Sequence, residues 1–193
     1  MRAHWSAADW VGRLRLNLGV IQHIGLSLMY ALRCTVTLLK RLGRPTVDAG
    51  APEATTALGD WFVRPLNVGR HRLLLCTSAL SLLPVIIPAR DLAGFPTRLM
   101  GALTEMLTAL AIPDAQIARE LRAMSDHRFA TTNSRTVLGS MTDFIRMADW
   151  QIYEGPQPPD LLVASLQLAE APCGPIRHQR PKDVARTLLQ RVV

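Results

Sequence analysis

The sequence has few of the residues that mark metal-binding and cofactor-binding proteins. Its three cysteines, Cys34, Cys76 and Cys173, are widely spaced and form no CxxC pair. Its five histidines form no HExxH motif, and neither a Walker loop nor a dinucleotide-binding fingerprint is present. We therefore expect no metal site and no bound cofactor. An odd number of scattered cysteines is typical of a reducing compartment, so the expected location is the cytoplasm.

Lysine is also scarce, because Lys40 and Lys182 are the only two and the other basic residues are arginines. The formal net charge is +7, but its distribution is uneven. Residues 1–45 hold seven basic groups and one acid, a net of +6, and residues 46–193 hold fifteen basic and fourteen acidic groups, a net of +1. A basic excess confined to one end is weak evidence for a nucleic-acid partner.

Long apolar runs are missing as well. A helix that crosses a membrane needs roughly 20 consecutive apolar residues. Residues 20–39 come nearest, and Gln22, His23 and Arg33 interrupt them. We expect no membrane span.

The chain has the length and balance of one folded domain. It has 193 residues, of which 49% are hydrophobic and 19% charged. Residues 1–28 differ from the rest, and Trp10, Leu14 and Leu18 keep helical spacing there. We expect a dispensable amphipathic helix over residues 1–28. We expect a single α+β domain over residues 29–193, helical from about residue 158.

Hydrophobic periodicity, capping residues and prolines predict the elements of that domain. Residues 44–59 have no periodicity and predict an exposed connection before Trp61 and Phe62. The fold class is therefore α+β, with a small, mostly antiparallel sheet of about four strands covered by four to six helices. Strands are predicted over residues 30–35, 71–77, 82–88 and 127–132, and helices over residues 36–42, 96–110, 113–124, 134–152, 159–170 and 181–192.

Several strings resemble a family of small bacterial proteins described only as a domain of unknown function. The resemblance spans roughly residues 29–190 and implies the fold and the domain limits, but no activity. The family has an amide where this chain has Thr142. The strings are Leu32-Arg33-Cys34-Thr35 with residues 38–42, Gly59-Asp60-Trp61-Phe62, Leu75-Cys76-Thr77 with Leu82-Leu83, residues 133–143, and residues 168–175.

The junction between the strand ending at Thr132 and the following helix is a candidate anion site. Asn133 or Ser134 can cap that helix, and Arg135 lies in its first turn. Free N–H groups at a helix start, together with a guanidinium, suit a phosphate. Simple helix capping is the structural alternative.

Other polar side chains join this junction as candidates. Ser140 and Asp143 lie off the apolar stripe of the same helix, and with His127 they supply the residue types of a catalytic triad. The chain lacks the G-x-S-x-G turn of such enzymes. The candidate ligand-binding residues are Arg33, Lys40, Asp60, Trp61, Asn133, Ser134, Arg135, Ser140 and Asp143.

Three functions are compatible with these residues. The favoured hypothesis is a non-catalytic binding or regulatory module with an anion or nucleic-acid contact near Thr132 to Arg135. The alternatives are a small metal-free hydrolase or nuclease acting on a phosphate-bearing substrate, and a protein–protein interaction module. The sequence does not identify the partner, and whether the chain is an enzyme stays open.

Overall fold

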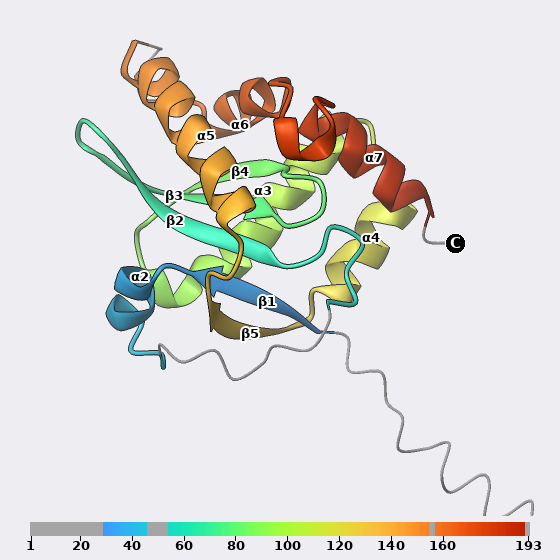
Figure 1. Cartoon of the computed structure of the whole chain (residues 1–193), viewed down its shortest axis with the longest axis horizontal. Helices are drawn as coiled ribbons and strands as arrows, with labels where there is room; N and C mark the ends of the chain where they lie inside the picture. Colours follow the sequence, from blue (N-terminus) through green and yellow to red (C-terminus); the bar gives the residue numbers. More distant parts are fainter. Residues whose placement is uncertain (1–28, 46–53, 155–156, 192–193) are drawn as a thin grey trace, which may run out of the picture.

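The computed structural model describes residues 29–45, 54–154 and 157–191 (Figure 1). The predicted helix over residues 1–28 lies outside this part of the chain. None of the described helices has the length and the hydrophobicity needed to span a lipid bilayer. The elements are β1 (Met29–Cys34), α2 (Val36–Arg41), β2 (Trp61–Val68), β3 (His71–Ser78), β4 (Pro84–Pro88), α3 (Phe95–Ala109), α4 (Asp114–Ala123), β5 (Asp126–Thr131), α5 (Arg135–Glu154), α6 (Leu161–Ala169) and α7 (Pro181–Arg191), with short 3-10 turns at Leu92–Gly94 and Gly174–Ile176.

The strands form one mixed sheet in the order β4-β3-β2-β1-β5. β1 runs parallel to both of its neighbours, β2 and β5, whereas β2, β3 and β4 are joined as antiparallel hairpins. The α+β class is confirmed. The described sheet has five strands rather than about four, and its two parallel pairings were not expected, because periodicity does not reveal strand direction.

The unexpected strand is β2. Only its first residues, Trp61 and Phe62, were expected near the sheet, since Pro65 within a run argues against a strand. β2 pairs with β1 only from Trp61 to Val63. Pro65 therefore lies beyond the end of β1, and its missing N–H costs no hydrogen bond in the sheet. The predicted strands and helices elsewhere in the domain are confirmed within a few residues.

Helices cover both faces of the sheet (Figure 1). α3 packs on one face in a core that includes Leu32, Trp61 and Cys76. α5 packs on the other face in a second core that includes Phe62 and Leu75. The alternation of these side chains along β1, β2 and β3 follows from the two-residue period of a strand.

The sequence of β4 prevents this edge strand from pairing with a further strand. The backbone N–H of Ile86 points away from β3 and donates to Ser165 Oγ in α6 at 2.9 Å. Residues two positions away in a strand point the same way, so Pro84 and Pro88 occupy the other outward positions and have no N–H to offer. This edge therefore presents no free backbone donor to a second strand.

Ser165→Ala removes the acceptor of this buried N–H, so the free energy of unfolding should fall by about 1–3 kcal/mol in chemical denaturation. Ser140→Ala is the matched control. Ser140 is also a buried helical serine, but its hydroxyl bonds only within its own helix, to the carbonyl of Thr136 at 3.4 Å. Equal losses in both variants would contradict a role for Ser165 in closing the edge.

Candidate anion-binding site

A pocket of about 350 Å³ opens at the carboxyl ends of β1 and β5, beside the start of α5. Strands β1 and β5 are parallel and adjacent, so Thr35 and Thr132, which follow them, lie side by side in the pocket wall. Figure 1 shows these strand ends beside α2 and the first turn of α5. The remaining lining residues are Arg64, Arg135, Leu138, Gly139 and Thr142.

The chain leaves these two strands toward opposite faces of the sheet. After β1 it forms α2, whose buried Leu38 and Leu39 belong to the core on the α3 face. After β5 it forms α5 on the other face. In open sheets, ligands bind in the crevice formed where the connections after two neighbouring parallel strands turn to opposite faces of the sheet. The position of the pocket therefore follows from the topology.

Two arginines give the pocket its charge. Arg64, on β2, donates through Nη1 to Thr142 Oγ1 at 2.9 Å and to the carbonyl of Leu138 at 3.4 Å. These contacts hold its guanidinium against α5. Arg135 is the first residue of α5 and is exposed. The described lining has no carboxylate, so its electrostatic potential favours an anion.

Thr35, Thr132 and Thr142 also line the pocket, and the hydroxyl of Thr142 donates to the carbonyl of Leu138 at 3.0 Å. Thr35 Oγ1 is buried and has no hydrogen-bond partner among the described residues. Ser134 Oγ accepts from the backbone N–H of Val137 at 3.3 Å, so Ser134 caps α5 as predicted. Gly139 leaves space, because a side chain at that position would meet no described atom within 4 Å. The pocket can thus place a small oxyanion beside the guanidinium groups of Arg64 and Arg135.

A buried ion pair lies under this region. Arg33 Nε donates to Asp60 Oδ2 at 2.6 Å, and both side chains are almost buried. Asp60 Oδ1 accepts from the backbone N–H of Ala31 at 2.8 Å, and Arg33 Nη1 donates to the carbonyl of Thr131 at 3.4 Å. The pair therefore connects the start of β2 with both strands that border the pocket. Arg33 and Asp60 therefore fix the relative positions of the strands beside the pocket, and they do not line the pocket themselves.

A buried carboxylate on α4 holds the segment that carries Asp60. Glu120 accepts from the backbone N–H groups of Ala57 and Leu58 at 2.8 and 3.0 Å. Burial raises the pKa of Glu120 above its usual value of 4.5, while the two N–H bonds and nearby Arg119 act in the opposite direction. The conformation of the segment just before β2 thus depends on the carboxyl group of Glu120.

The structure separates the other predicted residues from the pocket. Lys40 is exposed on α2, and Asn133 is exposed before α5. Trp61 is fully buried in the core on the α3 face, where it has no surface to stack against a ligand. Asp143 is exposed, 3.9 Å from Arg146. None of these four lines the pocket.

The residues of the imagined triad do not meet. Ser140 lies on α5, and its hydroxyl bonds to the carbonyl of Thr136. His127 lies on the opposite face of the sheet, with its ring 6.0 Å from that of Tyr30 and 5.4 Å from that of Phe129. Burial lowers the pKa of His127, which favours the neutral ring. Ser140, Asp143 and His127 therefore form no triad, which agrees with the lack of a G-x-S-x-G turn in the sequence.

The thiols do not supply a nucleophile. Cys34 and Cys76 are buried on the α3 face, and Val63 lies between them in the strand register. Cys34 and Cys76 are thus two strands apart, which is about 10 Å and too far for a disulfide bond. Burial raises the pKa of the Cys34 thiol to about 12 and that of Cys76 further. No group of three or more possible metal ligands occurs among the described residues.

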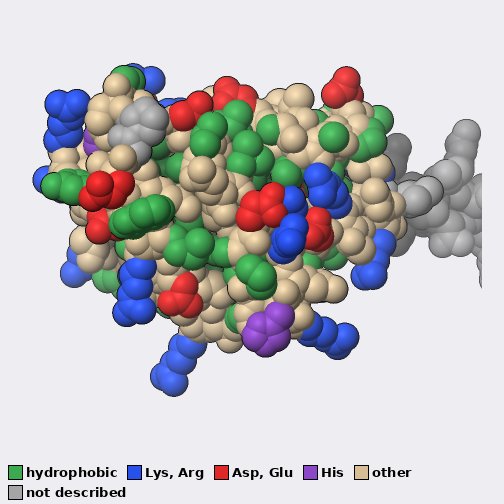
Figure 2. Space-filling model, turned by 90° about the horizontal axis from the view of Figure 1, so that it is seen from above, with side chains coloured by type: hydrophobic (Ala, Val, Ile, Leu, Met, Phe, Trp, Pro, Cys, Tyr) green, Lys and Arg blue, Asp and Glu red, His purple; other side chains and the backbone are tan. Residues whose placement is uncertain are grey.

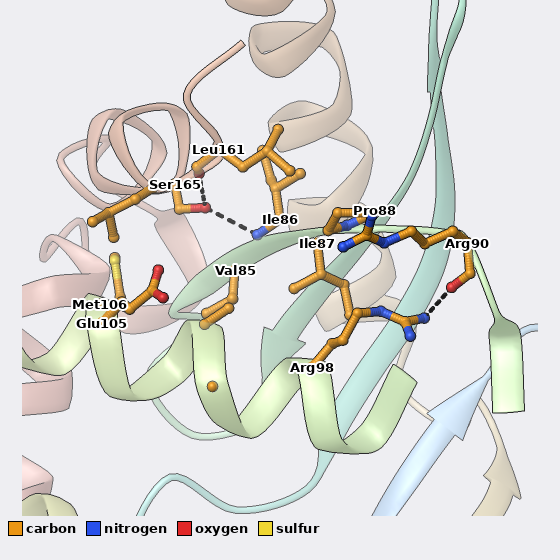
Figure 3. Close-up of a pocket in the computed structure, with 13 residues that line it drawn as sticks. Val85, Ile86, Ile87, Pro88, Arg90, Arg98, Glu105, Met106, Leu161 and Ser165 are labelled. Carbon is orange, nitrogen blue, oxygen red and sulfur yellow. Dashed lines mark hydrogen bonds between the residues drawn. The ribbon is translucent and has the colours of Figure 1, made fainter. Parts of the chain in front are cut away.

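A second pocket, of about 340 Å³, lies between β4, α3 and α6 (Figure 3). Arg90 and Arg98 both line it, but the guanidinium of Arg98 donates to the backbone carbonyls of Arg90 and Asp91. Ser165, on the opposite wall, accepts from the backbone N–H of Ile86. Glu105 adds a carboxylate to this lining, so the pocket at the start of α5, whose described lining has none, is the better candidate for an anion.

Sequence reasoning missed Arg64 as a site residue. Its position depends on β2, which was not predicted, and an arginine two residues after Trp61 and Phe62 gives no local indication of a site. Thr35 and Thr142 belong to the sequence strings that resemble the family, but no role was predicted for either residue.

The sequence model of a family described as a domain of unknown function (DUF6933) matches residues 31–184. The chain belongs to the DUF6933 family. No curated protein and no solved structure matches the chain. The matched residues of this DUF6933 domain include all five strands except the first two residues of β1, as well as the whole pocket lining.

In this DUF6933 domain, Asp60→Ala should lower the free energy of unfolding by about 3–5 kcal/mol, because it removes the carboxylate from a buried ion pair. Asp60→Asn keeps an acceptor for the N–H of Ala31 and should cost less. Chemical denaturation of the two variants measures the difference. A loss below about 1 kcal/mol for Asp60→Ala, the range of surface ion pairs, would contradict the structural role.

Glu120 should make stability depend on pH. Its folded-state pKa is raised, so its contribution is fully present below pH 4.5 and is lost as the pH rises through the raised pKa. Glu120→Gln does not titrate. The difference in unfolding free energy between wild type and Glu120→Gln should therefore move in favour of the variant as the pH increases. Parallel pH curves for the two proteins would refute this.

Proposed function

We propose that this DUF6933 domain is a non-catalytic binding module that holds a phosphate or a similar anionic group in the pocket at the start of α5. One observation carries the proposal. Arg64 and Arg135 flank a hollow at the carboxyl ends of β1 and β5, with no carboxylate in its described lining. Charge, the start of a helix and topology all favour an anion at the same place.

The chemistry of the lining supports binding rather than catalysis. The described lining residues contribute guanidinium, hydroxyl and apolar groups, and no imidazole, thiol or carboxylate. General acid–base catalysis near neutral pH uses mainly such titratable groups. The hydrolase alternative would need Asp60, Ser140 or Asp143, and these have other contacts or lie elsewhere.

The size of the pocket supports a small ligand. The hollow has a volume of about 350 Å³ and is largely open to solvent, so it suits a small anionic group rather than the enclosure of a large ligand. A nucleotide or a phosphorylated metabolite fits this volume better than a nucleic-acid duplex, which binds along an extended basic surface. We propose that residues 29–193 form the functional unit and act in the cytoplasm, which agrees with three free thiols.

A thermal-shift screen against inorganic phosphate, nucleotides and short nucleic acids tests the proposal. A ligand at about 100 times its Kd stabilises the native state by about 2.7 kcal/mol, so the unfolding midpoint should rise. Arg135→Ala and Arg64→Ala should each reduce this rise. The matched control is Arg146→Ala, an exposed arginine on α5 that does not line the pocket.

Three outcomes would count against the proposal. If no anion raises the unfolding midpoint, the domain does not bind phosphate or similar anions. An equal shift in Arg135→Ala and wild type would move the site elsewhere. Binding only to long nucleic acid, with a steep dependence on salt, would replace a small-molecule pocket by a basic surface.

A further inference from the structure

The far end of α5 exposes two large aromatic side chains. Trp150 is 70% exposed and Tyr153 is 71% exposed. The stripe of α5 that faces the sheet consists of other residues, among them Phe144, Ala148 and Ile152. The fold therefore does not account for these aromatics on the surface. Exposed tryptophan and tyrosine are typical of interaction sites.

Trp150 borders a pocket of about 480 Å³ between the end of α5 and the start of α6. Most of the wall is apolar, and Val163 is itself 46% exposed. Rigid side chains dominate the wall, so little conformational entropy is lost when a partner binds. The apolar lining residues are Trp150, Ile152, Pro158, Pro159, Val163 and Ala164.

The polar part of the wall consists of two carboxylates and the amides of Gln151 and Gln167. Glu154 and Asp160 contribute carboxylates, and no lysine or arginine is among the described residues that line the pocket. Gln151 also lines it, and its Oε1 is buried without a partner in the described structure. The chain as a whole carries a charge of +7, so this acidic lining is a local exception.

Figure 2 looks down on α5, α6 and α7 and shows acidic and hydrophobic side chains side by side at its left end. An aromatic face beside carboxylates attracts a cation through both the ring quadrupole and the ionic charge. Arginine suits this combination best, because its planar group stacks on rings and donates to carboxylates at once.

We propose that this pocket docks a basic segment of a partner protein, with an arginine side chain stacked on Trp150 and paired with Glu154 or Asp160. The site lies at the opposite end of α5 from the anion pocket. Trp150 follows Arg135 by fifteen residues, which is roughly 22 Å along the helix. The proposal does not rest on the anion-binding function.

Isothermal titration of the full chain with a short, capped peptide of alternating glycine and arginine tests the proposal. A matched peptide with citrulline keeps the shape and removes the charge. The arginine peptide should bind, and the citrulline peptide should bind at least about tenfold more weakly. Binding should also weaken with salt, because the contact is ionic and exposed.

Variants of the chain locate the contact. Trp150→Ala should weaken binding about tenfold or more. Glu154→Gln combined with Asp160→Asn removes the charge. The amide of Asp160→Asn still has an oxygen to cap α6, where the carboxylate of Asp160 now accepts from the N–H of Val163 at 3.0 Å. Asp149→Asn is the control, because Asp149 is exposed next to Trp150 and does not line the pocket.

Four results would overturn the proposal. These are no binding of the arginine peptide, equal binding of the citrulline peptide, unchanged binding in Trp150→Ala, and a loss in Asp149→Asn as large as in the double variant. Sedimentation gives a separate test: a dimer that Trp150→Ala dissociates would show that a second copy of the chain fills the pocket.

Discussion

The carboxylate of Asp60 is the constraint on which the arrangement around β1 depends. β1 has a parallel neighbour on each side, and on the β2 side the pairing begins only at Leu32. Before that point, Asp60 Oδ1 accepts a hydrogen bond from the backbone N–H of Ala31, and Asp60 Oδ2 accepts one from Arg33 Nε. Arg33 in turn reaches the carbonyl of Thr131 at the end of β5. Asp60 and Arg33 together thus join the start of β2 to β1 and β5, the two strands whose ends border the pocket.

The position of Asp60 depends on a second buried acid. Glu120 holds the segment before β2 through two backbone N–H groups, and the hydroxyl of Thr55 bonds to the backbone of Met29. Loss of either acid would leave buried donors without partners, which costs more than a single surface contact. The segment before β2, which carries Asp60, is therefore held by polar contacts to α4 and to the start of β1.

Local patterns predicted most of the elements, because four strands and the helices have clear periodicity, caps or proline limits. They did not predict β2, where Pro65 and Arg64 interrupt a strand-like run. They also did not show that β1 is parallel to its neighbours, since direction depends on contacts distant in sequence. Of the nine candidate ligand-binding residues, only Arg135 lines the proposed pocket, because it follows from the start of the helix. Arg64 reaches the pocket only through the sheet, which local patterns do not reveal.

The two ends of α5 differ in charge and offer different chemistry. Its first turn faces arginines and hydroxyls, and its last turn borders carboxylates and an exposed tryptophan. The helix packs on β2 and β3 along its length, so both ends have fixed positions relative to the sheet. A module that holds an anion at one end and a basic segment at the other would be consistent with a regulatory role.

The most direct test of the central claim is a titration of the isotope-labelled chain with inorganic phosphate, followed by backbone amide NMR. The account predicts that the amides of Thr35, Thr132 and the first turn of α5 shift together with one Kd. The amides around Trp150 should stay unchanged. Shifts spread over exposed arginines throughout the surface, or none at the start of α5, would contradict the account.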